Sequence, residues 1–136
     1  MSNKQIAAAI NLAPSSCHER IKALREAGVL QSTHAVVNLR ALGLMLQAIL
    51  FVQLAKLRRP VVDKFLASTA EVPEVRSVFL VSGPFDLIVH VVARDMDHLK
   101  DLISDHFNSY PVVVRVETSL IFDHKALPSM PLPEAI

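Results

Sequence analysis

Tryptophan is absent from this 136-residue sequence, and cysteine occurs only once, as Cys17. A single cysteine excludes an internal disulfide and a cysteine-rich zinc site, and it is typical of a chain kept in a reducing compartment. Glycine occurs only at Gly28, Gly43 and Gly83, each at a break between periodic segments, so no flexible glycine-rich linker is expected. The formal net charge is +1, so any basic surface for nucleic acid has to be local.

Long uninterrupted apolar runs are also missing, although 51% of the residues are hydrophobic and the mean hydropathy is +0.38. The longest run, residues 41–55, contains Gln47 and Gln53 and falls short of the roughly 18 residues that a membrane span needs. The polar N-terminus does not resemble a secretory signal. We therefore expect no membrane partner and a cytoplasmic location, with the surplus apolar surface buried in an oligomer.

The first thirty residues predict two short helices. Ser2 and Gln5 have the spacing of a capping box, and Ile6 and Ile10 follow on one helical face. A second helix is expected from Pro14, which suits a first helical position, to Ala27, just before Gly28.

The two faces of this second helix differ in chemistry. Cys17, Ile21 and Leu24 share one side, and the opposite arc is polar. Two helices joined by a tight turn form the helix-turn-helix pattern, whose second helix enters the DNA major groove. An ordinary solvent-exposed helix remains the alternative, because acidic side chains dilute the basic ones. The polar arc consists of Ser15, His18, Glu19, Lys22, Arg25 and Glu26.

The remaining two thirds follow the order strand, helix, strand, strand, helix, strand. This order predicts an α+β, ferredoxin-like fold with both helices on one face of an antiparallel sheet. One helix opens at Pro60, with Val61, Phe65 and Leu66 inward. Asp95 caps the other, whose apolar face is Leu99, Leu102, Ile103 and Phe107. The expected strands are residues 44–55, 75–82, 86–94 and 112–124.

Both faces of the expected strands are apolar. By the period of two, Ala48 and Leu50 oppose Ile49 and Phe51 in the first strand. In the second strand Val75 is expected to share a face with Phe79 and Val81, opposite Val78 and Leu80. Two helices cover only one face of a sheet, so the other face requires a partner. We expect face-to-face dimerisation.

These elements resemble the Lrp/AsnC (feast/famine) family of transcription regulators. The stretch from Ile6 to Leu30 is similar to that family's reading head, with Leu12, Ser15, Arg20, Ile21, Leu24, Gly28 and Val29 in register. The family's Thr-Gly-x-x-Asp-hydrophobic turn is matched by Val81-Ser-Gly-Pro-Phe-Asp-Leu87. Its Pro-x-Val entry to the second strand is matched by Val72-Pro-Glu-Val75, and the threonine of its last strand by Val116-Glu-Thr-Ser119.

The resemblance implies a partial winged helix-turn-helix followed by a RAM-type sensing domain of the dimeric α+β barrel class. The expected boundaries are residues 1–34 for DNA binding, 35–44 for the connection, 45–127 for sensing and 128–136 for the tail. The resemblance further implies that the partners are double-stranded DNA and a small effector, an amino acid. It implies no cofactor, no metal and no catalysis. A homodimer would assemble to a tetramer or octamer.

The same resemblance suggests two sets of site residues. In the reading head, Ser15, Ser16 and His18 would touch base edges, and Lys22 and Arg25 would contact phosphates. In the turn, Gly83 amides would hold a carboxylate and Asp86 an ammonium group, although both residues also have purely structural roles in such turns. The DNA-binding set is Ser15, Ser16, His18, Glu19, Arg20, Lys22 and Arg25, and the effector-binding set is Ser82, Gly83, Pro84, Phe85, Asp86 and Thr118.

Two departures from the family pattern keep alternatives open. Ala13 stands where the family has a capping serine, and the family's first helix has no counterpart before Ser2. A sensing and assembly module that does not bind DNA is therefore one alternative. An enzyme similar to siroheme decarboxylases is another, although the histidines are scattered along the chain.

Two histidines have simpler interpretations. His98, Asp101 and Asp105 could share a metal, but an ordinary polar helix face is the preferred interpretation. His90 lies within a strand, which suggests a hydrogen-bonded core or interface residue.

Overall fold

The chain forms two compact units, residues 1–38 and 39–136, in a computed structural model. The structure describes residues 14–32, 35–55, 58–129 and 131. The helix expected after Ser2 lies outside these residues, as do the side chains of positions 14–16. No helix within the described ranges has the length and apolar character to cross a membrane.

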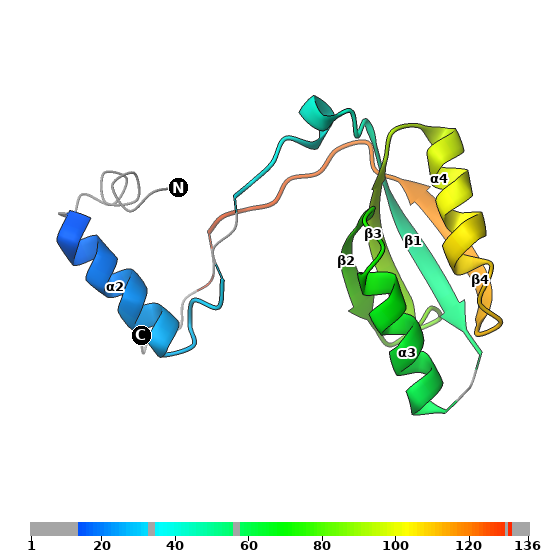
Figure 1. Ribbon diagram of the computed structural model, residues 1–136, viewed down its shortest axis with the longest axis horizontal. Coiled ribbons are helices and arrows are strands. Elements are labelled where there is room, and N and C mark those ends of the chain that lie inside the picture. Colours follow the sequence, from blue (N-terminus) through cyan, green and yellow to red (C-terminus); the bar gives the residue numbers. More distant parts are fainter. Residues whose placement is uncertain (1–13, 33–34, 56–57, 130, 132–136) are drawn as a thin grey trace. The chain divides into compact units, whose positions relative to one another are not determined.

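In the first unit, the helix α2 runs from Pro14 to Glu26 (Figure 1). Its end is fixed by Gly28, which has a φ of 77°. The Gly28 amide donates to the Arg25 carbonyl at 3.1 Å, and the Val29 amide donates to the Leu24 carbonyl at 2.9 Å. This pair of bonds is a Schellman motif, and it needs the left-handed backbone that glycine adopts without strain. The predicted end of the helix is therefore confirmed, within one residue.

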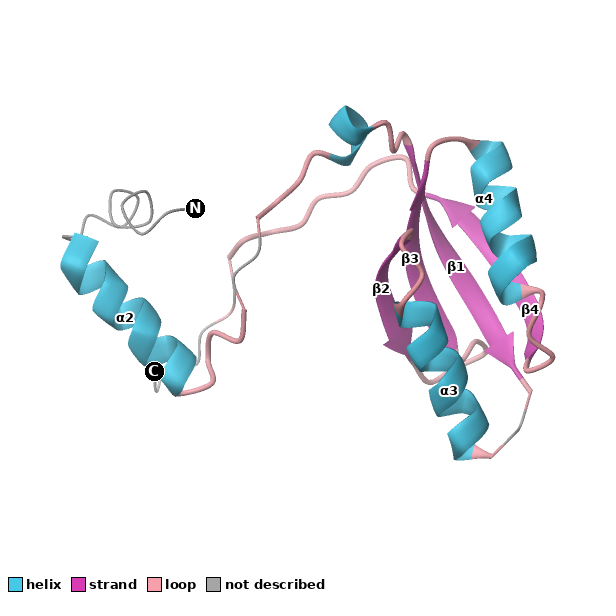
Figure 2. Ribbon diagram, viewed as in Figure 1, coloured by secondary structure: helices cyan, strands magenta, loops and turns pink. Residues whose placement is uncertain are grey.

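The second unit is a four-stranded antiparallel sheet with two helices on one face (Figures 1 and 2). Its strand order is β2-β3-β1-β4, which is the ferredoxin-like order expected from the sequence. A 3₁₀ turn, η1 (Leu39–Leu42), precedes the sheet within the expected connection. The strands are β1 (Leu46–Leu54), β2 (Val75–Leu80), β3 (Leu87–Ala93) and β4 (Val113–Leu120), and the helices are α3 (Arg59–Ala70) and α4 (Met96–Leu102), which continues into a π-helical turn, η2 (Ile103–Phe107).

The core lies between the helices and the sheet. Alternate residues of the two central strands, including Leu50 and Val89, are fully buried there. Phe65 and Phe107 fill the space beneath the helices with their rings 6.3 Å apart. Asp95 caps α4 as predicted, since its carboxylate accepts from the His98 amide at 2.8 Å.

Two details of the strand and helix faces differ from the sequence prediction. Val75 packs against the core with Val78, because a bulge at Arg76 inserts one extra residue and shifts the alternation. Val61 is 43% exposed, whereas Val62 packs against the core in its place. The fourth strand is also shorter than predicted, since it ends at Leu120 rather than at residue 124.

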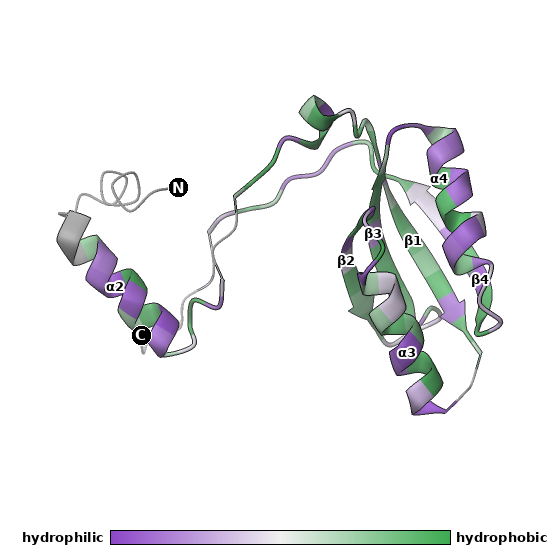
Figure 3. Ribbon diagram, in the orientation of Figure 1, coloured by the Kyte–Doolittle hydropathy of each residue, from purple (hydrophilic) through white to green (hydrophobic). Residues whose placement is uncertain are grey.

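Within the described residues 39–55 and 58–129, no element covers the sheet face opposite the helices. Ile49, Phe51 and Ile88 lie on it, and Phe79 there is 55% exposed. The hydropathy colouring shows β1 and β3 as hydrophobic along most of their length (Figure 3). We call this surface the open face. A free antiparallel sheet is ordinarily polar on its solvent side, so the open face has the character of an interface.

Candidate functional site

The exposed surface of α2 carries most of the residues predicted to contact DNA. His18, Glu19, Arg20, Lys22 and Arg25 are all exposed, while Cys17 is buried on the other side. Ser15 and Ser16 lie in the first turn of the helix, and their side chains lie outside the described set. Leu24, expected to point inward, is 44% exposed. His18, Lys22 and Arg25 share one exposed side of the helix, and Arg20 is exposed on a different side.

The loop between β2 and β3 carries five of the six residues predicted to bind an effector. Ser82, Gly83 and Pro84 are exposed, and Gly83 has a φ of 118°, so the turn depends on glycine. Phe85 packs on Phe51 of the open face with their ring centres 5.7 Å apart.

Asp86 has extensive structural contacts in this loop. Its Oδ2 accepts a hydrogen bond from the Leu54 amide at 2.7 Å, its own amide donates to the Val52 carbonyl, and its carbonyl accepts from the Val81 amide. The β1–β4 register shifts between Gln53 and Leu54, and the carboxylate partners the Leu54 amide there. One carboxylate oxygen is thus committed to the backbone.

Thr118, the sixth predicted effector residue, lies on β4 opposite Leu50. Leu50 is buried beneath the helices, so Thr118 belongs to the helix-bearing side of the sheet at its exposed edge. Phe85, in contrast, packs on the open face. Within one chain, the structure does not bring these two side chains to the same face.

His98 makes two polar contacts that link α4 to the segment before β2. Its Nε2 lies 3.1 Å from Glu74 Oε1, and its Nδ1 accepts from the Arg94 amide at 3.0 Å. Partial burial raises the pKa of Glu74, but the His98 hydrogen bond and the nearby charges of His98 and Arg94 lower it further than burial raises it. His98 thus joins α4 to the start of β2 rather than pairing with Asp101. Among the described residues, no three metal-binding side chains gather at one point.

His106 lies beneath the helices, where Phe65 stacks on its ring at 5.7 Å and its Nε2 lies 3.0 Å from Thr69 Oγ1. The Thr69 hydroxyl donates to the Phe65 carbonyl, so the histidine donates to threonine. Burial lowers the pKa of His106, as expected for a cation moved out of water. This residue therefore has a packing role.

Both units of the chain match models of known protein families. Residues 47–127 match the family model of the Lrp/AsnC ligand binding domain, and residues 1–31 match a winged helix-turn-helix DNA-binding model. The chain belongs to the Lrp/AsnC family. It is a transcription regulator of this family, and the predicted family and fold are confirmed.

Individual members of the Lrp/AsnC family align over most of the chain. The regulator AldR from Mycolicibacterium smegmatis is 35% identical over 90% of this chain and 71% of its own length. The regulator AzlB from Bacillus subtilis is 30% identical over 98% of this chain and 86% of its own. A crystal structure of a Neisseria meningitidis transcriptional regulator in complex with L-methionine superposes with a TM-score of 0.85, at 27% identity, covering 100% of this chain and 88% of that one.

Proposed function

We propose that α2 is the recognition helix of this regulator and that the sheet unit assembles it and senses a small amino acid. The observation that carries the proposal is the exposed side of α2 with Lys22 and Arg25, within a segment that matches a DNA-binding helix-turn-helix model. A recognition helix lies in the major groove with its N-terminal residues closest to the bases. Ser15, Ser16 and His18 then face base edges.

The remaining α2 residues take supporting roles. Arg20, Lys22 and Arg25 are exposed along the helix and supply phosphate contacts, which position a protein on the duplex without reading sequence. Glu19, also exposed, can accept from a cytosine amino group. A DNA partner places the protein in the compartment of the chromosome, the cytoplasm of a prokaryotic cell, and this role requires no catalytic step.

A salt titration of DNA binding tests this assignment. The full chain should lose affinity for duplex DNA linearly on a logarithmic salt scale, because phosphate contacts release counterions. Replacing both Lys22 and Arg25 by alanine should reduce the slope by roughly one for each lost phosphate contact. Lys100→Ala is the matched control, since Lys100 is an exposed lysine on α4. An unchanged slope in the double variant would contradict the role of α2, and no binding at low salt would favour the assembly module without DNA binding.

We further propose that a second copy of the chain covers the open face. Ile49, Phe51, Ile88 and Phe79 form an apolar surface on one side of a sheet whose other side is already covered. A stable dimer buries roughly 800 Å² on each partner, and two identical sheets packed face to face satisfy the two-fold symmetry of most homodimers. Dimers of this kind can assemble further into tetramers or octamers.

Sedimentation of the full chain checks the dimer. Phe79→Glu should convert the dimer to a monomer at micromolar concentration, because it places a charge in an apolar interface. Val61→Glu changes an exposed valine on the helix side in the same way and should leave the dimer intact. A wild-type protein that sediments as a monomer would overturn the proposal.

The loop from Ser82 to Asp86, together with Thr118 of a neighbouring copy, is the effector site that the family resemblance favours. The Neisseria relative was solved with L-methionine, and the loop exposes a hydroxyl and a glycine amide that can hold a carboxylate. Ser82→Ala and Thr118→Val should then weaken the binding of an amino acid in calorimetric titration. Asp86 contributes its remaining carboxylate oxygen.

A further inference from the structure

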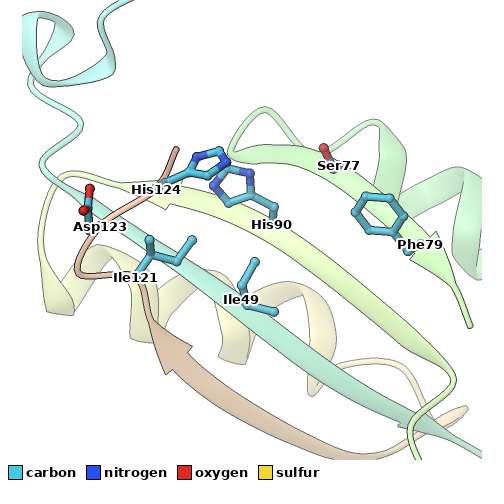
Figure 4. A pocket seen from close by; sticks show the side chains of 7 residues that line it. All are labelled: Ile49, Ser77, Phe79, His90, Ile121, Asp123 and His124. Atoms are coloured by element: carbon cyan, nitrogen blue, oxygen red, sulfur yellow. The ribbon is translucent and has the colours of Figure 1, made fainter. Parts of the chain in front are cut away.

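Two histidines lie together in a cavity of about 400 Å³ on the open face (Figure 4). Ile49 and Phe79 supply apolar walls, His90 comes from β3, and His124 comes from the segment after β4. The centres of the two imidazole rings are 5.9 Å apart, and Figure 4 shows the rings side by side. A pair of titratable side chains therefore occupies the face that we expect a second copy of the chain to cover.

The neutral form of His90 fits its surroundings better than the charged form. Its Nε2 lies 2.8 Å from Gln47 Oε1. With that oxygen as the acceptor, Nε2 carries the proton of the neutral ring, and acid adds the second proton at Nδ1. No acceptor among the described residues is hydrogen-bonded to Nδ1. Once the face is covered, the charged ring would therefore hold an N–H group without a partner, which is costly.

The charged groups around His90 do not neutralise a second proton. Arg76 lies nearby on β2, and His124 and Asp123 line the same cavity. Partial burial lowers the pKa of His90, and the neighbouring charges of His124 and Arg76 lower it further. Asp123 is exposed and forms no ion pair with either histidine among the described residues. Protonation of the pair thus adds positive charge beside an arginine without a bound counter-charge.

We propose that the dimer on the open face dissociates in acid, because protonated His90 and His124 would place positive charges beside Arg76 in a surface that has lost its water. The proposal rests on the dimer put forward above. An unpaired charge is costly to bury, and the neighbouring like charges repel it. The separate subunit therefore accepts protons more readily than the dimer does, so acid favours the separate subunit.

The direction of the pH dependence follows from the same difference. Covering the open face removes more water from His90, so its pKa is lower in the dimer than in the separate subunit. The dimer is then strongest above the ordinary histidine pKa of about 6.5, and it weakens as the pH falls through the pKa of the separate subunit. A difference of one pKa unit lowers the dimerisation constant by up to about tenfold for each copy, and both copies contribute.

Sedimentation equilibrium of the full chain at pH 7.5 and 5.5 tests the proposal, with circular dichroism to monitor the fold. The dimer Kd of the wild type should rise by about tenfold or more at pH 5.5. The double variant His90→Gln/His124→Gln has no titratable group at either position and should lose most of this rise. His98→Gln is the matched control, because His98 lies on α4 and pairs with Glu74; its rise in Kd should equal that of the wild type.

A fixed charge at neutral pH gives a second test that needs no acid. His90→Lys should raise the dimer Kd at pH 7.5 by about tenfold or more, whereas His90→Gln should leave it close to the wild-type value. If circular dichroism shows that His90→Lys disturbs the fold, His124→Lys provides the same charge at an exposed position.

The outcomes separate the acid response from the dimer itself. A wild-type chain that is monomeric at pH 7.5 would overturn both. A wild-type dimer with the same Kd at pH 7.5 and 5.5 would overturn the acid response and retain the dimer. An undiminished rise in the double variant would assign the response to other groups and so contradict the proposal. If acid unfolds the chain, the lysine variants at pH 7.5 decide, and an unchanged Kd in them would refute it.

Discussion

The two units of this regulator differ most in how much of each is buried. In the sheet unit, a continuous core of apolar side chains joins both helices to the central strands. In the described part of the first unit, Cys17 is the one buried residue, while Leu24 is partly exposed and Val29 and Val36 are largely exposed. A segment this short cannot remove enough apolar surface from water to be stable alone. The sheet unit therefore provides the stability, and α2 provides a surface for recognition.

Truncation of the core should give the largest effect and the sharpest contrast. Phe65→Ala should lower the free energy of unfolding by about 3–5 kcal/mol, because it leaves a cavity beneath the helices. Leu24→Ala should cost less than about 1 kcal/mol, since this leucine is only partly buried. Urea denaturation followed by circular dichroism measures both. Equal costs would contradict the contrast between the units.

Asp86→Asn should give the next largest effect. The substitution weakens a charge-assisted hydrogen bond to the Leu54 amide and should cost about 1.5–3 kcal/mol. Asp101→Asn, at an exposed position on α4, should change the stability by no more than about 0.5 kcal/mol. Thermal melts of the two variants provide the comparison. A neutral Asp86→Asn melt would mean that its carboxylate does not stabilise the sheet.

Acid should destabilise the sheet unit through His106. Burial lowers the pKa of this histidine in the folded state, so the unfolded chain takes up the proton more readily. The contribution of His106 is complete above about pH 6.5, and it is lost as the pH falls through the folded pKa. Unfolding at pH 7.5 and 5.5 should differ by at most about 1 kcal/mol from this source. His106→Gln, which retains a hydrogen-bond donor for Thr69, should reduce that difference; an identical pH dependence in wild type and variant would exclude His106 as its cause.

The smallest effect is expected at the surface of α3. Arg59 and Asp63 form an exposed ion pair at 3.1 Å, one helical turn apart. Asp63→Asn should cost under about 0.5 kcal/mol, because such pairs are screened by water. Urea titrations at low and high salt check this value. A cost comparable to that of Asp86→Asn would show that surface charge, rather than burial, sustains the sheet unit.

The sequence alone could predict the order of the strands and helices because its apolar periodicity and its caps, such as Asp95, are local signals. It could not predict the bulge at Arg76, since bulges depend on pairing with β3, and this bulge moved Val75 to the core face. The exchange of Val61 for Val62 on α3 could have been predicted, because Val62 stands three and four residues before Phe65 and Leu66 and so shares their helical face.

The candidate sites show the same limit. The exposed residues of α2 could be inferred from helical periodicity, and His90 was expected to be a hydrogen-bonded residue, which Gln47 confirms. The open-face cavity could not be predicted, because residues 121–124 were expected to continue the last strand. Only the chain leaving β4 after Leu120 brings His124 beside His90. Two histidines distant in sequence and brought together by tertiary structure leave no local pattern.

Hydrogen exchange of the full chain, with and without duplex DNA at low salt, tests the division of roles most directly. Without DNA, amides of β1 and β3 should exchange only through global unfolding, and those of α2 should exchange orders of magnitude faster. Adding DNA should protect α2 and leave β1 and β3 unchanged. Equal protection of both units in the free protein, or DNA-dependent protection confined to the sheet, would contradict the account.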